Sequence, residues 1–272
     1  MNSGQKAIKI AAICLAVFII INIVNAIFMG LSFIGGFHSN HQEGKHFVET
    51  YEQVKKIKLD INAASVKVLL GDELKVEATD VSNRFTSKVL NNNTLKIEEH
   101  HSWFWHHQSG EIILTIPQSM LLEELDIDCG AGRIDISNIT AHELKLDAGA
   151  GLLKIDHSNF QETNLNGGAG EINISSSLLR NLDLDAGIGK VQIDSEIYGK
   201  SEINCGIGEV NLHLGNVSNY QFIIQKGIGS IEVNDVTYNK DVTLGNGENI
   251  LKIEGGVGSI RINYLESKDK SI

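Results

Sequence analysis

Residues 182–193 read Leu-Asp-Leu-Asp-Ala-Gly-Ile-Gly-Lys-Val-Gln-Ile, and this stretch decides the fold. Apolar residues alternate with polar ones through Leu182 and Leu184, and the alternation then shifts phase to Val191 and Ile193. A period of two is typical of a strand with one buried face, and the phase shift marks a sharp bend. A Gly-Ile-Gly triplet stands at the bend, where glycine accepts positive φ at least steric cost. The stretch therefore predicts a strand, a corner and a second strand.

The same pattern occurs seven times along the chain. The segments begin at Leu125, Leu144, Thr163, Leu182, Ser201, Phe222 and Leu251. Their turn glycines are Gly130 and Gly132, Gly149 and Gly151, Gly168 and Gly170, Gly187 and Gly189, Gly206 and Gly208, Gly227 and Gly229, and Gly256 and Gly258. The first glycines of the pairs are evenly spaced from Gly130 to Gly206, and the last two intervals, to Gly227 and then to Gly256, are longer. An even step of about 19 residues indicates a repeat architecture.

A repeat of this length is too short to bury a hydrophobic core alone, so each repeat must stack its apolar rows on its neighbours, about 4.8 Å away. The sequence therefore predicts an all-β fold, a parallel β-solenoid of about 19-residue Gly-x-Gly repeats over residues 125–265. We expect it to be right-handed, as parallel crossovers almost always are. The longer last interval holds residues 237–247, which we expect to form an extra hairpin or a cap.

Residues 54–124 are expected to form an N-terminal β cap region. Residues 57–68 resemble a degenerate repeat, and three shorter segments, 74–78, 95–99 and 111–116, alternate as strands do. The polar residues 266–272 are expected to be a frayed tail.

The N-terminal segment is apolar. No Asp, Glu, Lys or Arg occurs between Lys9 and Glu43, and residues 7–36 exceed the roughly 20 apolar residues that cross a bilayer. We expect one transmembrane helix over 7–36 that holds the protein to the lipid bilayer. A buried core helix and a signal peptide cleaved near Ala26 are the alternatives, but the apolar run continues about ten residues beyond that position.

Charges that flank this span predict its orientation. Lys6 and Lys9 precede it, whereas His38, His41 and Glu43 follow it. The positive-inside rule then places residues 1–6 in the cytoplasm and everything after the span outside it, beginning with a linker over 37–53. The expected location is the cell membrane, with a single pass.

The composition of the chain limits the kinds of partner that it can bind. The formal net charge of −11 argues against nucleic acid, whose phosphates require clustered Lys and Arg. Cys129 and Cys205 occupy the small-residue position before the first glycine and are expected to pack in the core, four repeats apart. No cofactor is expected.

One position earlier, each repeat carries a polar residue. The row is Asp128, Asp147, Asn166, Asp185, Asn204, Gln225 and Glu254. Stacked repeats would form a polar ladder on the outer face, in which amides relieve repulsion between acids. Binding of a cation by Asp128 and Asp147 is the alternative.

Two glycine-rich segments resemble known binding motifs but do not match them. Gly167–Ile172 resembles the calcium-binding nonapeptide of RTX proteins, but the position that requires Asp is an inward Ile. The triplet at Gly149 lacks the third glycine and the following helix of a dinucleotide fingerprint.

The most unusual stretch is His100-His101-Ser102-Trp103-Phe104-Trp105-His106-His107, between two predicted strands. Paired histidines could bind zinc or copper, so His100, His101, His106 and His107 are the candidate metal ligands. The aromatic residues could instead sit at a membrane interface or stack on a sugar or a partner.

Three parts of the sequence resemble the bacterial putative-adhesin family, also called toast-rack. They are Glu111–Pro117, the Gly-x-Gly ladder from Leu125, and the insert Leu244-Gly-Asn-Gly-Glu-Asn249 followed by Gly255-Gly-Val-Gly. The likeness covers residues 54–264. It implies an extracytoplasmic β-solenoid, often tethered by one helix, and some members accompany Lia-type envelope-stress systems. The family carries no established catalytic residues to transfer.

We therefore expect a non-enzymatic, membrane-anchored cell-surface scaffold that binds an unknown envelope protein, with a role in envelope-stress sensing. An adhesin that binds a cell-wall glycan or a surface is the alternative. A polysaccharide-active solenoid enzyme is a third reading, and it requires several acids that meet in a groove on adjacent repeats.

Overall fold

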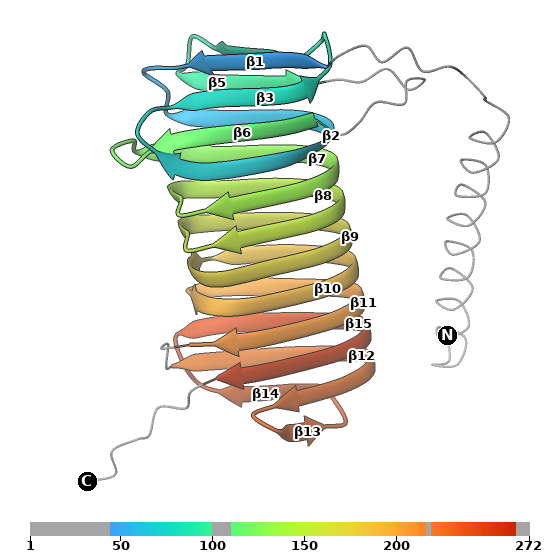
Figure 1. The fold of residues 1–272 in the computed structure, drawn as a ribbon. Helices are drawn as coiled ribbons and strands as arrows, with labels where there is room; N and C mark the ends of the chain where they lie inside the picture. Colours follow the sequence, from blue (N-terminus) through green and yellow to red (C-terminus); the bar gives the residue numbers. More distant parts are fainter. Residues whose placement is uncertain (1–43, 100–109, 216–218, 265–272) are drawn as a thin grey trace, which may run out of the picture. The chain divides into compact units, whose positions relative to one another are not determined.

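The computed structural model describes residues 44–99, 110–215 and 219–264. Within them the chain forms strands and no helix, stacked in one sheet that winds along an axis (Figure 1). The strands are β1 (Lys45–Thr50), β2 (Lys56–Gly71), β3 (Lys75–Val81), β4 (Thr86–Val89), β5 (Thr94–Glu99), β6 (Gly110–Pro117), β7 (Leu122–Ser137), β8 (Thr140–Asp156), β9 (Asn159–Arg180), β10 (Leu182–Tyr198), β11 (Lys200–Leu214), β12 (Tyr220–Val233), β13 (Val236–Tyr238), β14 (Val242–Gly245) and β15 (Asn249–Tyr264). All-β architecture is thus confirmed.

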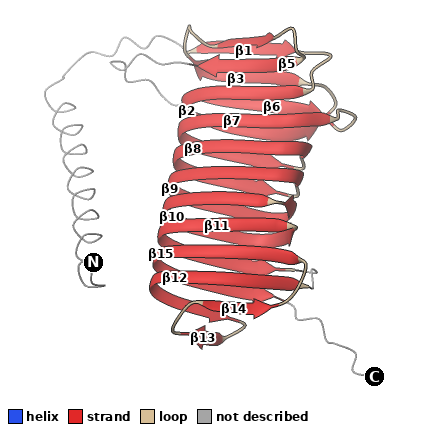
Figure 2. Ribbon diagram, turned by 180° about the vertical axis from the view of Figure 1, so that it is seen from behind, coloured by secondary structure: helices blue, strands red, loops and turns tan. Residues whose placement is uncertain are grey.

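The long strands are the rungs of the solenoid. Each runs through the first predicted strand, the corner and the second predicted strand, and stays paired with its neighbouring strands along this path (Figure 2). We call the two straight halves of a rung its arms. Pairing is parallel, and the constant repeat step places equivalent residues side by side, as with Asp183 and Glu202 or Gly189 and Gly208. The prediction of parallel repeats is confirmed.

The two inward rows of each rung build the core. On β10, Leu184 and Val191 lie on opposite sides of the corner and are fully buried, and so is Ile193. Burial of a Leu, Ile or Val side chain contributes roughly 1.5–3 kcal/mol. Because every rung repeats these positions, the core is continuous along the stack.

The corners leave no room for side chains. The second glycine of each pair has φ between +136° and +156°, a region that L-residues rarely adopt. A Cβ on Gly189 would also overlap the carbonyl oxygen of Gly170 on the preceding rung, β9. The first glycine of the pair, Gly187, has no positive φ, but a Cβ there would overlap the carbonyl oxygen of Gly168.

The rungs do not stack in chain order at the C-terminal end. The order is β10, β11, β15, β12, so the seventh repeat lies between the fifth and the sixth. Sequential stacking of neighbouring repeats was the expectation, and it is wrong here. The long interval between the last two repeats allows this order, because β13 and β14 pair antiparallel with the outer edge of β12 and the chain then returns to the inner side of that rung. Residues 237–247 thus contribute to the cap that was predicted.

An atypical residue marks β12 as the terminal rung. Its small-residue position holds Lys226, whose Nζ donates to the carbonyl oxygen of Gly229 at 2.9 Å. Its backbone N–H donates to Asp241 in the cap at 3.0 Å. Such a long side chain fits because no further rung stacks beyond this corner among the described residues.

The N-terminal part continues the same sheet. β2 pairs in parallel with β7 through the corner, and β5 and β6 pair in parallel with its two arms. The strands predicted over 74–78, 95–99 and 111–116 correspond to β3, β5 and β6. Residues 45–50 of the predicted linker over 37–53 form a strand instead, and this strand, β1, pairs antiparallel with β3. The ring of Phe47 packs edge-on against that of Phe85, with the ring centroids 5.1 Å apart.

Residues 1–6 and the predicted transmembrane segment 7–36 lie outside the described residues, as does the tail 266–272. No helix with the length and hydrophobicity of a membrane span is found in 44–99, 110–215 or 219–264.

The corner geometry predicts that Gly189→Ala lowers the free energy of unfolding by about 3 kcal/mol, because the new Cβ meets both an unfavourable φ and a backbone oxygen. Gly215→Ala is the matched control, since nothing lies within 4 Å of its added Cβ. Chemical denaturation followed by circular dichroism measures both. Equal midpoints for the two variants would contradict this account of the corner.

The rung order predicts which engineered cysteine pairs form a disulfide. Glu209 on β11 lies directly beside Ser259 on β15, at the spacing of paired strands, which is within disulfide reach. Glu209→Cys with Ser259→Cys should therefore oxidise within one chain. Glu209→Cys with Ser230→Cys, the pair expected from sequential stacking, should stay reduced. Mass spectrometry of the digested protein distinguishes the two, and the opposite result would restore sequential stacking.

Candidate functional site

The corners form an exposed apolar ridge. The residue between the two glycines is exposed or half-buried on every Gly-x-Gly rung, and in stacking order this ridge row is Ala131, Ala150, Ala169, Ile188, Ile207, Val257 and Ile228. Ile188 is 42% exposed and Ile228 is 55% exposed. Ile207 and Val257, the other two larger residues of the row, are half-buried.

The turn glycines predicted as structural residues all lie on this ridge. The space beside it is too small to enclose a ligand: the cavity lined by Cys129, Ala148 and Ala186 has a volume of about 20 Å³, close to that of one water molecule. The ridge can therefore offer an outer surface but no enclosed site.

The polar ladder lies on one side of the ridge, as predicted. Asn166 Nδ2 donates to Asp147 at 2.6 Å, and Asn204 Nδ2 donates to Asp185 at 2.9 Å. Burial, together with the neighbouring Asp60, Asp147 and Asp126, raises the pKa of the Asp128 carboxyl. Amides thus connect acids along the stack at two steps.

The ladder does not form a metal site in this structure. Across the described ranges, no group of three His, Cys, Asp or Glu side chains is arranged to hold a metal ion. Binding of a cation by Asp128 and Asp147 therefore has no geometric support among these residues.

The two described cysteines are core residues. Cys129 on β7 and Cys205 on β11 are buried and free, and four rung steps separate them. Burial raises the pKa of both thiols, so the protonated, unreactive form dominates at neutral pH.

A second row of small polar residues stabilises the turns at the far edge from the ridge. The hydroxyl oxygen of Ser158 accepts the N–H of Ile139 at 3.1 Å, Ser177 accepts that of Ser158 at 3.1 Å, and Ser195 accepts that of Ser177 at 3.0 Å. These buried hydroxyls satisfy backbone donors that the turns leave without a strand partner.

A polar recess of about 470 Å³ opens beside this serine row. Its wall includes His157, Asn159, Ser176, Asp194 and Glu196. The recess exists because β10 is shorter than its neighbour at this turn: the register with β9 shifts between Asp194 and Glu196.

The sequence carried a signal of this recess that was missed. The step from Ser158 to Ser177 is 19, as in the regular repeat, but the step from Ser177 to Ser195 is only 18. A rung that is short by one position at the turn leaves space against the longer rung beside it.

Hydrogen bonds order one wall of the recess. Asp156 accepts from Ser175 at 2.6 Å and pairs with Nδ1 of His157 at 2.8 Å. These two contacts lower the pKa of the Asp156 carboxyl. Glu196 accepts a hydrogen bond from Tyr198 at 2.9 Å. The recess therefore presents carboxylate, imidazole, amide and hydroxyl groups, which suit hydrogen bonding to a polar ligand.

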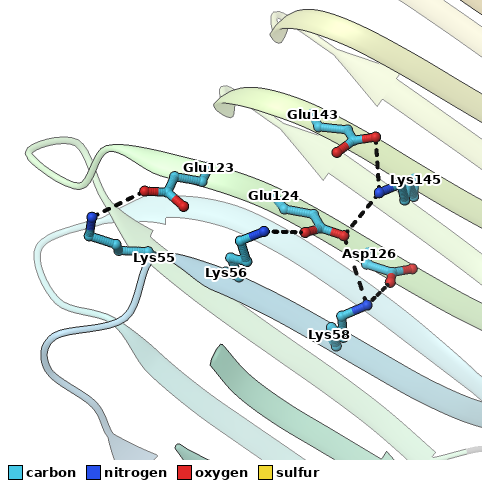
Figure 3. Close-up of polar contacts among 8 residues, drawn as sticks. All are labelled: Lys55, Lys56, Lys58, Glu123, Glu124, Asp126, Glu143 and Lys145. Carbon is cyan, nitrogen blue, oxygen red and sulfur yellow. Dashed lines mark hydrogen bonds and ion pairs between the residues drawn. The ribbon is translucent and has the colours of Figure 1, made fainter. Parts of the chain in front are cut away.

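A charge network joins three rungs near the N-terminal end (Figure 3). The Glu124 side chain on β7 is only 9% exposed, and its carboxylate contacts Lys56 at 2.9 Å, Lys145 at 3.1 Å and Lys58 at 3.8 Å. Burial acts to raise the pKa of Glu124, but the hydrogen bonds from Lys56 and Lys145 outweigh it and hold the pKa below its usual value. The network ties β2 to the first Gly-x-Gly rungs, β7 and β8. We assign it a structural role.

The predicted metal ligands His100, His101, His106 and His107 lie outside the described residues. The residues that flank this stretch are described: Glu99 pairs with Ile61, and Gly110 pairs with Ala64. β5 and β6 both run parallel to β2 and pair with its first and second halves.

The Glu124 network predicts that Glu124→Gln lowers the apparent free energy of unfolding by about 1–2 kcal/mol at neutral pH, because three lysines lose a largely buried counter-charge. Glu123→Gln, which removes the exposed pair with Lys55, should cost less than about 0.5 kcal/mol. Denaturant titration measures both.

The difference should also depend on pH. Because the folded pKa of Glu124 is lowered, its contribution is present above the unfolded value of 4.5 and is lost as the pH falls through the folded value. A Glu124→Gln effect that stays constant from pH 7 down to acid would argue against this electrostatic role.

Comparison with known proteins gives the chain a family. No curated protein matches it. Among solved structures, it is similar to a putative cell adhesion protein from Clostridium sporogenes, with 15% identity, a TM-score of 0.39, and coverage of 81% of this chain and 99% of that one. It is also similar to a putative adhesin from Bacteroides fragilis, with 12% identity, a TM-score of 0.41, and coverage of 81% and 97%.

A putative lipid binding protein from Parabacteroides distasonis is similar at 15% identity and a TM-score of 0.37, with coverage of 82% and 97%. The family assignment rests on sequence instead. The sequence model of the Toastrack DUF4097 family matches residues 54–248, which include the N-terminal rungs, six of the Gly-x-Gly corners and the cap. The chain therefore belongs to the Toastrack DUF4097 family.

Proposed function

We propose that this protein is a non-enzymatic scaffold of the cell envelope, anchored in the membrane through residues 7–36, whose solenoid binds another envelope component. One observation carries the proposal: the rungs present outer side chains in straight rows on a backbone that is hydrogen-bonded to both neighbours. Such rows hold their spacing without a partner, so binding loses little conformational entropy. Family membership supports a repeat protein of this kind.

The proposed anchor connects to the solenoid at one end of the sheet. The chain enters through β1, the outermost strand of the sheet order. The hydrophobic segment 7–36 is longer than the roughly 20 apolar residues that a bilayer requires. The proposed location is the cell membrane, with the solenoid outside the cytoplasm, and a role in envelope-stress sensing is part of the proposal.

We place the contact with the envelope component at the polar recess. Asp194 and Glu196 give it negative charge, and His157, Asn159 and Ser176 add hydrogen-bonding groups. A binding site of this composition favours a basic or hydroxyl-rich ligand. The same composition supports the second candidate function, adhesion to a cell-wall glycan, because sugar hydroxyls bind to such groups.

A polysaccharide-active enzyme would need the two carboxylates of this recess for acid–base chemistry. The enzyme reading therefore depends on Asp194 and Glu196, which makes it testable with the same variants.

Crosslinking of the full-length protein in intact cells tests the function. A photo-reactive residue in place of Ser176, on the rim of the recess, should capture the same envelope protein in repeated experiments. The same residue in place of Gln192, an exposed position of β10 outside the recess, should not. Asp194→Ala with Glu196→Ala should reduce the capture at Ser176 about tenfold or more, because the charged wall is lost.

The alternatives predict other outcomes. Capture of wall glycan alone from Ser176 would establish adhesion in place of scaffolding. Release of soluble sugar from isolated cell walls, abolished by Glu196→Gln, would establish an enzyme. Equal capture from Ser176 and Gln192 would remove the recess as the binding site.

A further inference from the structure

The ridge row has a shallow groove along one side. The far wall of this groove is the row two residues after each ridge residue, and we call it the flank row: Arg133, Leu152, Glu171, Lys190, Glu209, Ser259 and Ser230. Around β10 the groove is lined by Ile188 and Lys190 and floored by small residues such as Ala186 and Gly170. At the C-terminal end it is lined by Ile228 and Ser230.

The groove holds almost no enclosed volume, so it cannot take a compact ligand. A straight row of apolar side chains at the rung spacing can lie along it instead. The ridge of a second copy is such a row, with the same spacing of about 4.8 Å; it carries Ala on β7, β8 and β9, and Ile or Val on β10, β11, β15 and β12.

Charges on the two sides of the ridge complement each other rung by rung. Across the corner, the polar ladder and the flank row combine Asp128 with Arg133, Asp147 with Leu152, Asn166 with Glu171, Asp185 with Lys190, Asn204 with Glu209, Glu254 with Ser259, and Gln225 with Ser230. Wherever the flank row is acidic, the ladder residue is an amide. Wherever the flank row is basic, the ladder residue is an aspartate. No rung places two like charges opposite each other.

These combinations are not satisfied within the chain. Arg133 makes its ion pair with Asp135, at 2.6 Å, on its own arm. Lys190 makes no ion pair with any described residue, and Asp185 accepts a hydrogen bond from Asn204.

We propose that two copies of this protein associate side by side and in parallel, each ridge row lying in the groove of the other. A two-fold axis parallel to the solenoid axis keeps every rung at the level of the same rung in the partner. It also brings the flank row of one copy beside the polar ladder of the other, so Lys190 meets Asp185 and Arg133 meets Asp128. An antiparallel pair would instead place ladder against ladder and bring acids together.

The contact is long and narrow. Seven rungs extend over roughly 30 Å, but only the ridge and the two adjoining rows take part. An interface of this width falls below the roughly 1,200 Å² of stable complexes, so the dimer forms at high local concentration. The association requires neither the recess nor its ligand, so its failure leaves the proposed function untouched.

Cysteine crosslinking in cells that express the full-length protein tests the arrangement. Cys14 is replaced by Ala, and the buried Cys129 and Cys205 are kept. In a parallel dimer every ridge residue lies near the axis, so Ile188→Cys and Ile228→Cys should each give a homotypic disulfide-linked dimer on mild oxidation. Gln192→Cys, exposed on the same rung but two residues beyond the flank row, should not.

Charge reversal supplies a second readout. Lys190→Glu in the Ile188→Cys background should lower the dimer yield about tenfold, because acids then face each other across the axis. Adding Asp185→Lys should restore it, which a folding defect could not do.

Three outcomes overturn the proposal. One is the absence of homotypic dimers at both 188 and 228. Another is a mixed link between Ile228→Cys and Ala131→Cys without a homotypic link at 228, which indicates an antiparallel pair. The third is a yield that Lys190→Glu leaves unchanged.

Discussion

Close contact between backbones at the corners is the constraint on which the rest of the structure depends. Neighbouring rungs approach so closely there that a Cβ on either glycine would overlap a carbonyl oxygen of the adjacent rung. Glycine at these positions lets each rung turn sharply while its hydrogen bonds to both neighbours continue. Two arms then face each other across a core of Leu, Ile and Val, and every repeat adds buried apolar side chains at equivalent positions.

A stack of this kind exposes edges only at its ends, and both ends are modified. The C-terminal end is covered by β13 and β14 on the two arms of β12, and the N-terminal end carries β1 and β4, short antiparallel strands outside β3 and β5. Short or covered edges protect a sheet against uncontrolled pairing with another chain. Growth of the solenoid end to end is thus disfavoured, whereas contact between copies through the sides is not.

Repetition also explains how a solenoid without an enclosed site can recognise a partner. Rows of side chains on a hydrogen-bonded backbone are ordered before binding. Local departures from the repeat give single rungs surface features that their neighbours lack. The recess beside the serine row arises from one such departure, a rung shortened between Ser177 and Ser195. The change from Ala169 to Ile188 along the ridge is another, and it turns a row of alanines into a row of larger aliphatic side chains, of which Ile188 and Ile228 are exposed.

The sequence alone determined the rungs, their parallel register and the glycine corners, because alternation, phase shift and a constant period are local properties that each repeat carries in full. It also placed the N-terminal strands, whose alternation is equally local, and a cap near residues 237–247. Only the tertiary structure decided that β15 lies between β11 and β12, since either order buries the same apolar rows and Lys226 was the one residue that marked the terminal rung. The same holds for the Glu124 network, in which Lys56 and Lys145 stand 68 and 21 positions from Glu124 along the chain. It holds for the recess too, because contacts between residues so far apart follow from how the rungs stack.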